Sequence, residues 1–183
     1  MNRKIIISAG HGGNDPGAVA NGYTERDLAI EFRELLVKEL LLLGVKPLID
    51  DNKNALKQTL AWLTGKYSSK DILFDIHWNA ASSKARGTEV IVPDNASIFE
   101  NNFAKNILNV FVSNGFVNRG VKPESQTARK RLGWMRPPAE NILIEMGFIT
   151  NLLDINLYQN LKYKLAKELA FVIYKSLIYL QLT

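Results

Sequence analysis

Three residues that can bind a metal ion or move a proton follow closely behind short apolar runs. They are His11, His77 and Glu145, and they include both histidines of the chain. In an open α/β sheet, functional side chains gather beyond the carboxyl ends of the strands. If the apolar runs are strands, the three residues lie at corresponding ends and form one site.

Two histidines and a glutamate are a common ligand set for catalytic zinc, with a fourth position left for water. Such a site needs a second carboxylate nearby as a base. Glu25 and Glu145 are the candidates for the ligand and the base, and the chemistry alone does not assign the two roles. The chain has no cysteine, which excludes disulfides, thiolate metal sites and a cysteine nucleophile.

Each candidate also has a purely structural interpretation. His11 could belong to a turn, His77 could be a core histidine, and Glu25 suits the first turn of a helix. Glu145 is harder to explain in this way, because a carboxylate at the end of an apolar strand loses solvation unless it is paired or bound. The combination of the four residues favours a site.

Other catalytic motifs fit less well. The segment Gly10-His11-Gly12-Gly13 is similar to the oxyanion loop of serine esterases, but the chain has no G-x-S-x-G elbow. The glycines also lack the spacing of a dinucleotide-binding or phosphate-binding loop.

The hydrophobic pattern alternates between short buried runs and amphipathic segments. The predicted strands cover residues 4–9, 45–49, 72–76, 88–92 and 141–144, with short strands near 120–122 and 132–135. The predicted helices begin at an N-cap Thr24 and stop at Gly44, begin at an N-cap Asn54 and end near Gly65, and cover residues 98–112 and 151–180. This alternation predicts a single α/β domain whose sheet is covered on both faces.

The composition, with 46% hydrophobic and 22% charged residues among 183, is typical of a soluble globular protein. The apolar run near the N-terminus is too short for a secretory signal, and no segment approaches the roughly 18 apolar residues of a membrane span. We therefore expect synthesis in the cytoplasm and no stable membrane insertion. The net charge of +5 favours polyanionic partners such as nucleic acid, anionic lipid or acidic wall polymers.

Several spaced motifs, in order, resemble one enzyme family. They are IIISAGHGGNDPGA, YTERDLA, DIHWNAA, RGTEVIV, NRGVK and PPAENILIEMGFITN. Together they resemble the zinc-dependent N-acetylmuramoyl-L-alanine amidases of the amidase type 3 family, cell-wall hydrolases of bacterial autolysins and phage endolysins. The resemblance covers nearly the whole chain. It implies a twisted, mostly parallel sheet of about six strands with helices on both faces.

The resemblance also implies roles for individual residues. His11, Glu25 and His77 would hold one Zn²⁺ ion, and Glu145 would be the catalytic acid/base. Asn79 would shape the substrate groove, and Arg136 is a further candidate for substrate contact. The bond cut would be the amide between the lactyl group of N-acetylmuramic acid and L-alanine.

From this resemblance we expect residues 1–183 to form one catalytic domain without a separate wall-binding domain, and to act as a monomer on the glycan strand and stem peptide of peptidoglycan. The predicted setting is a phage or prophage endolysin that reaches the wall after release at lysis. The alternatives are the catalytic domain of a bacterial autolysin, a non-catalytic wall-binding module, and another zinc peptidase or deacylase on the same scaffold.

The basic residues Arg129, Lys130 and Arg131 lie close in sequence to Arg119, Lys122 and Arg136. They form either a solvated loop face or a patch that meets anionic glycan, stem-peptide carboxylates or wall polymers. A nucleic-acid partner is not expected, because the cluster lacks interleaved aromatic residues and a recognisable binding module.

Overall fold

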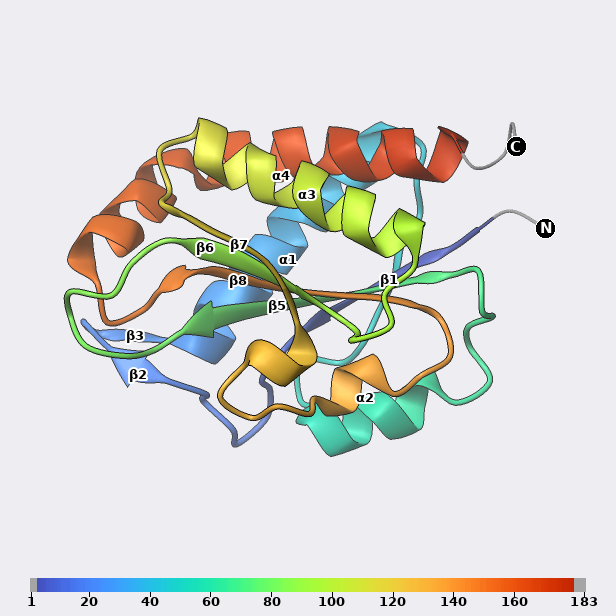
Figure 1. The fold of residues 1–183 in the computed structure, drawn as a ribbon, viewed down its shortest axis with the longest axis horizontal. Helices are drawn as coiled ribbons and strands as arrows, with labels where there is room; N and C mark the ends of the chain where they lie inside the picture. The colour runs from blue at the N-terminus through green and yellow to red at the C-terminus, as the bar shows by residue number, and fades with distance from the viewer. Residues whose placement is uncertain (1–2, 180–183) are drawn as a thin grey trace.

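The computed structural model describes residues 3–179 as an α/β fold around one six-stranded sheet (Figure 1). The strands are β1 Ile5–Ala9, β2 Val19–Ala20, β3 Tyr23–Thr24, β4 Leu48–Ile49, β5 Ile72–Asn79, β6 Thr88–Val92, β7 Asn118–Pro123 and β8 Glu140–Phe148. The helices are α1 Glu25–Leu42, α2 Leu56–Leu63, α3 Ile98–Ser113 and α4 Leu152–Tyr179, with short 3-10 helices η1 Glu124–Gln126 and η2 Gly133–Met135.

The main sheet has the strand order β4-β1-β5-β8-β6-β7, and β2 and β3 form a separate small hairpin. Strands β4, β1, β5 and β8 run parallel to one another, and β6 runs parallel to β7. The two blocks meet where β6 pairs antiparallel with β8. The predicted mostly parallel sheet of about six strands is confirmed.

The two faces of the sheet carry cores of different size. Helices α1, α3 and α4 cover one face and enclose the larger core, whereas α2 and η2 cover part of the other face (Figure 1). The smaller core on this second face contains Ile6, Leu63, Leu73, Ile91, Trp134, Met135 and Leu143. The prediction of helices on both faces is therefore confirmed.

Side chains that alternate along each strand explain where the polar residues gather. In β5, Phe74, Ile76 and Trp78 belong to the larger core, so the residues between them point to the second face. Towards the carboxyl end of β5 these are Asp75 and His77, where the apolar cover of the second face has ended. The part of this face that lies beyond the apolar cover of α2 and η2, which we call the groove face, positions the site.

Some predicted boundaries were wrong. Strands β5 and β8 do not end at His77 and Glu145, because Trp78 and Met146 continue to pack on the larger core. The predicted strand at residues 132–135 is the 3-10 helix η2. There the indole of Trp134 donates to the carbonyl of Ile142 at 3.2 Å instead of the backbone joining the sheet.

Two further differences have local causes. Strand β4 covers only Leu48–Ile49, because Pro47 has no N–H to give to a ladder within the predicted run. Helix α2 begins after Ala55 and not after Asn54, whose N–H is engaged in a turn with the carbonyl of Asp51. The predicted N-cap Thr24 is confirmed, since its side chain accepts from the N–H of Asp27. The last helix was predicted to reach residue 180, which lies outside the described residues.

Candidate metal and catalytic site

A row of polar residues crosses three neighbouring strands on the groove face. His77 of β5 is in register with Glu145 of β8, and Glu145 is in register with Glu89 of β6. Residues in register on adjacent strands point to the same face and lie about 5 Å apart at Cα. The sheet thus holds two of the predicted site residues side by side.

His11 reaches the same place from the loop that follows β1. This loop is attached to the sheet by the N–H of Gly10, which donates to the carbonyl of Ile76 at 2.9 Å. It also packs on the segment after β4, where the N–H of Gly13 donates to the carbonyl of Asn52 at 2.9 Å. That segment is held by a buried ion pair of 2.6 Å between Arg33 of α1 and Asp50.

Glu25 is the first residue of α1, and its side chain is 6% exposed. Its Oε2 accepts from the N–H of Ala18 at 3.0 Å, and its Oε1 accepts from the N–H of Trp78 at 3.1 Å. These bonds fix the carboxylate between the His11 loop and β5.

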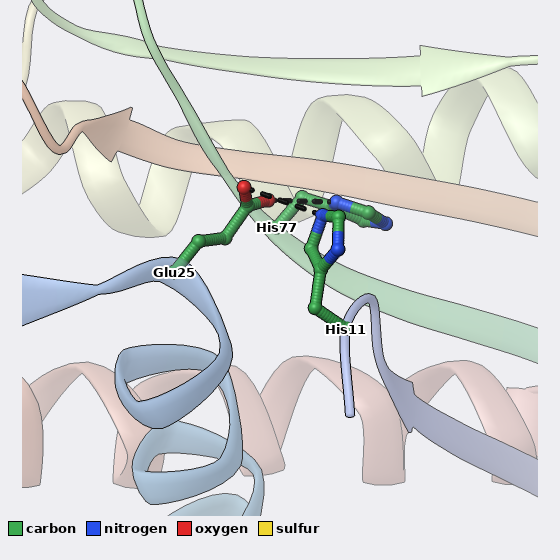
Figure 2. Close-up of side chains that lie close together, drawn as sticks. All are labelled: His11, Glu25 and His77. Carbon is green, nitrogen blue, oxygen red and sulfur yellow. Dashed lines mark hydrogen bonds and ion pairs between the residues drawn. The ribbon is translucent and has the colours of Figure 1, made fainter. Parts of the chain in front are cut away.

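His11, Glu25 and His77 converge on one point, although they come from a loop, a helix and a strand (Figure 2). Glu25 Oε2 lies 3.3 Å from Nε2 of His11, and Glu25 Oε1 lies 2.9 Å from Nδ1 of His77. One ligand atom from each residue lies within 4.8 Å of the other two. Among residues 3–179 this is the group of histidine and acidic side chains that could hold a metal ion.

The charges of this triad support one another. Burial opposes ionisation, but hydrogen bonds from His11 and His77 outweigh it and hold the pKa of Glu25 well below its ordinary value. In the same way, the pKa of His77 is raised despite its burial, because Asp75 and Glu25 favour the imidazolium. In the absence of a metal ion, the buried carboxylate of Glu25 thus favours the protonated form of both histidines.

Each histidine also contacts a carboxylate other than Glu25, through the ring nitrogen that faces away from Glu25 (its outer nitrogen). Asp15 Oδ2 lies 2.9 Å from Nδ1 of His11, and Asp75 Oδ2 lies 3.0 Å from Nε2 of His77. If a metal ion were bound, protons on these outer nitrogens, held by Asp15 and Asp75, would leave the nitrogens that face Glu25 free to act as ligands. Carboxylate–histidine pairs of this kind orient ligands in metal sites.

Two glycines make room for the triad. A Cβ at Gly10 would lie 2.1 Å from Nε2 of His77, and a Cβ at Gly17 would lie 2.6 Å from Oε2 of Glu25. Gly17 also has a φ of +62°, which disfavours other residues. The donor set, its outer carboxylates and these close approaches fit a bound zinc ion.

Glu145 lies beside the triad with an unpaired oxygen. Its Oε2 is buried and has no hydrogen-bond partner within residues 3–179. Burial, with the nearby carboxylates of Glu25, Glu89 and Asp75, raises the pKa of Glu145 to about 8, against an opposing effect of His77. A carboxyl group with a pKa near neutrality can both take up and release a proton.

The two predicted substrate contacts lie in different surroundings. Asn79 ends β5, and its Nδ2 donates to Oε1 of Glu89 at 3.1 Å, so it belongs to the groove face. Arg136 follows η2, where it forms an ion pair with the buried Glu124 and donates to the carbonyl of Leu132. Substrate contact by either residue stays a prediction.

Sequence reasoning missed Asp75, Asp15 and Glu89. Asp75 precedes His77 by two residues in a strand, so the period of two could have placed both on one face. Glu89, an acid within an apolar strand, could have been found by the desolvation argument applied to Glu145. No sequence signal distinguishes Asp15 from the other polar residues of its loop.

An α/β sheet that gathers two histidines and a glutamate, with a further glutamate beside them, has the donor set of a zinc hydrolase. Residues 5–175 match the family model described as N-acetylmuramoyl-L-alanine amidase, and the chain belongs to this family. Family membership confirms that the chain is a hydrolase of the amidase class with peptidoglycan as its substrate.

Individual relatives match most of this chain. The uncharacterised protein YqiI of Bacillus subtilis (strain 168) is 31% identical over 157 residues, which cover 83% of this chain and 73% of YqiI. The probable autolysin PH of Staphylococcus aureus (strain NCTC 8325 / PS 47) is 32% identical, but the match covers 84% of this chain and only 34% of the autolysin.

A crystal structure of an N-acetylmuramoyl-L-alanine amidase from Clostridium difficile 630 superposes with a TM-score of 0.75 at 26% identity. The superposition covers 99% of this chain and 98% of the amidase. The shared fold thus extends over the whole sheet and its helices.

Proposed function

We propose that this chain hydrolyses the amide between N-acetylmuramic acid and L-alanine with one zinc ion held by His11, Glu25 and His77, and with Glu145 as the general base. The main support is that ligand atoms of His11, Glu25 and His77 lie within 4.8 Å of one another. The carboxyl group of Glu145 lies next to them, because Glu145 is in register with His77.

Zinc, when bound in such a site, lowers the pKa of a water molecule towards about 7 and polarises the scissile carbonyl. The chain supplies the proton transfers. Glu145 takes a proton from the attacking water through its unpaired carboxylate and gives it to the departing nitrogen of L-alanine. Its position in register with His77 on the adjacent strand places it beside the three proposed ligands.

The surrounding residues keep the ligands in place during this reaction. Asp15 and Asp75 orient the imidazole rings, and the N–H groups of Ala18 and Trp78 hold the carboxylate of Glu25. The side chains of His11 and His77 are 18% and 17% exposed, so a polymer can reach them from solvent. The site therefore faces outwards while its carboxylate ligand stays buried.

Two substitutions separate metal binding from proton transfer. Glu145→Gln should retain one equivalent of zinc and lose activity on purified sacculi by about 10²- to 10⁴-fold. His77→Ala should lose the zinc as well. Glu34→Gln, on the exposed side of α1, is the matched control and should behave like wild type in both measurements.

The products test the reaction. Cleavage must release new L-alanine amino termini without new reducing sugar ends. Near-normal turnover by Glu145→Gln would refute its role as a base, and zinc-loaded protein that releases no L-alanine amino termini would refute the amidase reaction. Other peptide termini would indicate a zinc peptidase, and wall binding without products would indicate a binding module.

The biological setting stays a prediction. An endolysin made in the cytoplasm and released at lysis, and the catalytic domain of an autolysin, would contain the same site. The expected monomeric state also stays a prediction. Among residues 3–179, no helix is long and apolar enough to cross a membrane.

A further inference from the structure

The basic residues that are close in sequence separate into three places in the structure. Arg129, Lys130 and Arg131 are exposed on the loop between η1 and η2. Arg136 pairs with Glu124. The remaining two cations of the group, on β7, belong to the groove face.

Arg119 and Lys122 share one buried partner. Nε of Arg119 lies 2.9 Å and Nζ of Lys122 lies 2.6 Å from Oε2 of Glu89. The Glu89 side chain is only 9% exposed, whereas 34% and 27% of the two basic side chains remain exposed. The guanidinium of Arg119 also lies over the ring of Phe148 at 4.8 Å, and Asn79 donates to the other oxygen of Glu89.

Two cations over one carboxylate leave a net positive charge that is held in a fixed position. A guanidinium has five N–H donors and an ammonium has three. Within residues 3–179, Arg119 and Lys122 each use a hydrogen bond to Glu89 and make no other side-chain hydrogen bond. Their other donors can bind an anion without further ordering of the side chains, which lowers the entropic cost of binding.

Arg119 and Lys122 lie at a distance from Glu145, the proposed base, that suits contact with a substrate group near the scissile bond. Glu89 is in register with Glu145 on the adjacent strand, and adjacent strands lie about 4.8 Å apart. The charged groups bound to Glu89 are therefore about 8 Å from Glu145. Two residues of an extended peptide span about 7 Å.

We infer that Arg119 and Lys122, positioned by Glu89, form a subsite that binds a free carboxylate of the stem peptide about two residues beyond the cleaved amide. This inference rests on the proposed function, because the direction of the peptide is set by the site of cleavage. It makes the enzyme selective for stem peptides whose second residue carries a carboxylate and not a carboxamide.

The test compares two synthetic muramoyl peptides that differ only in whether the α-carboxyl group of the second stem residue is free or amidated. Wild type should have a kcat/KM about tenfold higher for the free acid, mainly through KM. Lys122→Gln and Arg119→Gln should each reduce this ratio several-fold while they retain turnover of the amide. Arg131→Gln, on the exposed loop, is the matched control and should keep the wild-type ratio.

Binding of the corresponding free stem peptides, measured by calorimetry, separates the subsite from the reaction. Wild type should bind the acid peptide about tenfold more tightly than the amide. This difference decides the inference even if the zinc-loaded enzyme cleaves neither substrate, a result that would refute only the proposed function. Equal binding of the two peptides by wild type, or an unchanged preference in both folded variants, would overturn the subsite.

Discussion

At the scale of the residue, the site consists of reactive groups that are each held by a polar partner. Glu25 accepts two backbone N–H bonds, and each histidine contacts a second carboxylate. Glu145 differs, because one of its oxygens has no partner within residues 3–179. The three proposed ligands are therefore fixed by hydrogen bonds, whereas the proposed base has an oxygen available to a substrate or water.

Asp75 should contribute to zinc affinity although it is not a proposed ligand. It is 1% exposed and lies beside the outer nitrogen of His77, so Asp75→Asn should weaken zinc binding by about 10- to 100-fold. Competition with a chromophoric chelator measures the affinity directly. Asp15→Asn is the comparison and should have a smaller effect, because the Asp15 side chain is 47% exposed. A wild-type affinity for Asp75→Asn would contradict this role.

At the scale of the element, a loop, a helix end and a strand must approach closely to form the triad. Thr24 caps α1 and thereby sets the position at which Glu25 begins the helix. The His11 loop passes so close to β5 that Gly10 leaves no space for a side chain. The precision of the site thus depends on backbone contacts between elements.

Gly10→Ala should displace His77 and abolish stoichiometric zinc binding, since its Cβ would lie 2.1 Å from the imidazole ring. Gly44→Ala is the matched control. Gly44 has a φ of +78° after α1, but a Cβ there meets nothing within 4 Å. This control should lose about 1 kcal/mol of stability and keep its zinc. Metal analysis and thermal melting measure both effects, and full zinc occupancy in Gly10→Ala would contradict the close approach.

At the scale of the whole molecule, stability and function use different faces of the sheet. The larger core between the sheet and α1, α3 and α4 supplies most of the apolar burial. The groove face collects Asp75, His77, Glu145 and Glu89, whose burial costs stability unless they are paired. Asp75 is paired with His77 and Glu89 with Arg119 and Lys122, whereas burial raises the pKa of Glu145.

The metal-free protein should lose stability as the pH rises. The pKa of Glu145 is raised from 4.5 to about 8, so the folded state binds its proton more tightly than the unfolded state, and the free energy of unfolding falls over this interval. The raised pKa values of His11 and His77 act in the same direction, because their contribution is lost as the pH passes through the folded values.

Urea denaturation of EDTA-treated wild type and Glu145→Gln measures this effect. The two proteins should be similarly stable near pH 4.5 and should diverge up to about pH 8, with wild type the less stable. Glutamine mimics the protonated carboxyl group but does not titrate, so the difference isolates Glu145. Parallel stability curves would show that the environment of Glu145 does not raise its pKa.

Much of the fold followed from local pattern. The alternation of apolar runs and amphipathic segments predicted the α/β class, and Thr24 and Gly44 correctly marked the ends of α1. The boundaries failed where long-range packing decided them. Strand β5 continues past His77 because Trp78 packs on the larger core, and residues 133–135 form a 3-10 helix because Trp134 inserts against the sheet.

The sequence by itself determined the class of fold and the family, and it predicted His11, Glu25, His77 and Glu145 as the site, because residue types and motifs are local properties of the chain. Only the tertiary structure decided which residues surround them. The strand register places Glu145 between His77 and Glu89, and the contacts of Gly10 with Ile76 and of Gly13 with Asn52 hold the His11 loop beside β5. The tertiary structure also separates Arg119 and Lys122 from the exposed basic loop of Arg129, Lys130 and Arg131. Register and packing depend on contacts between distant segments, and a local pattern does not contain them.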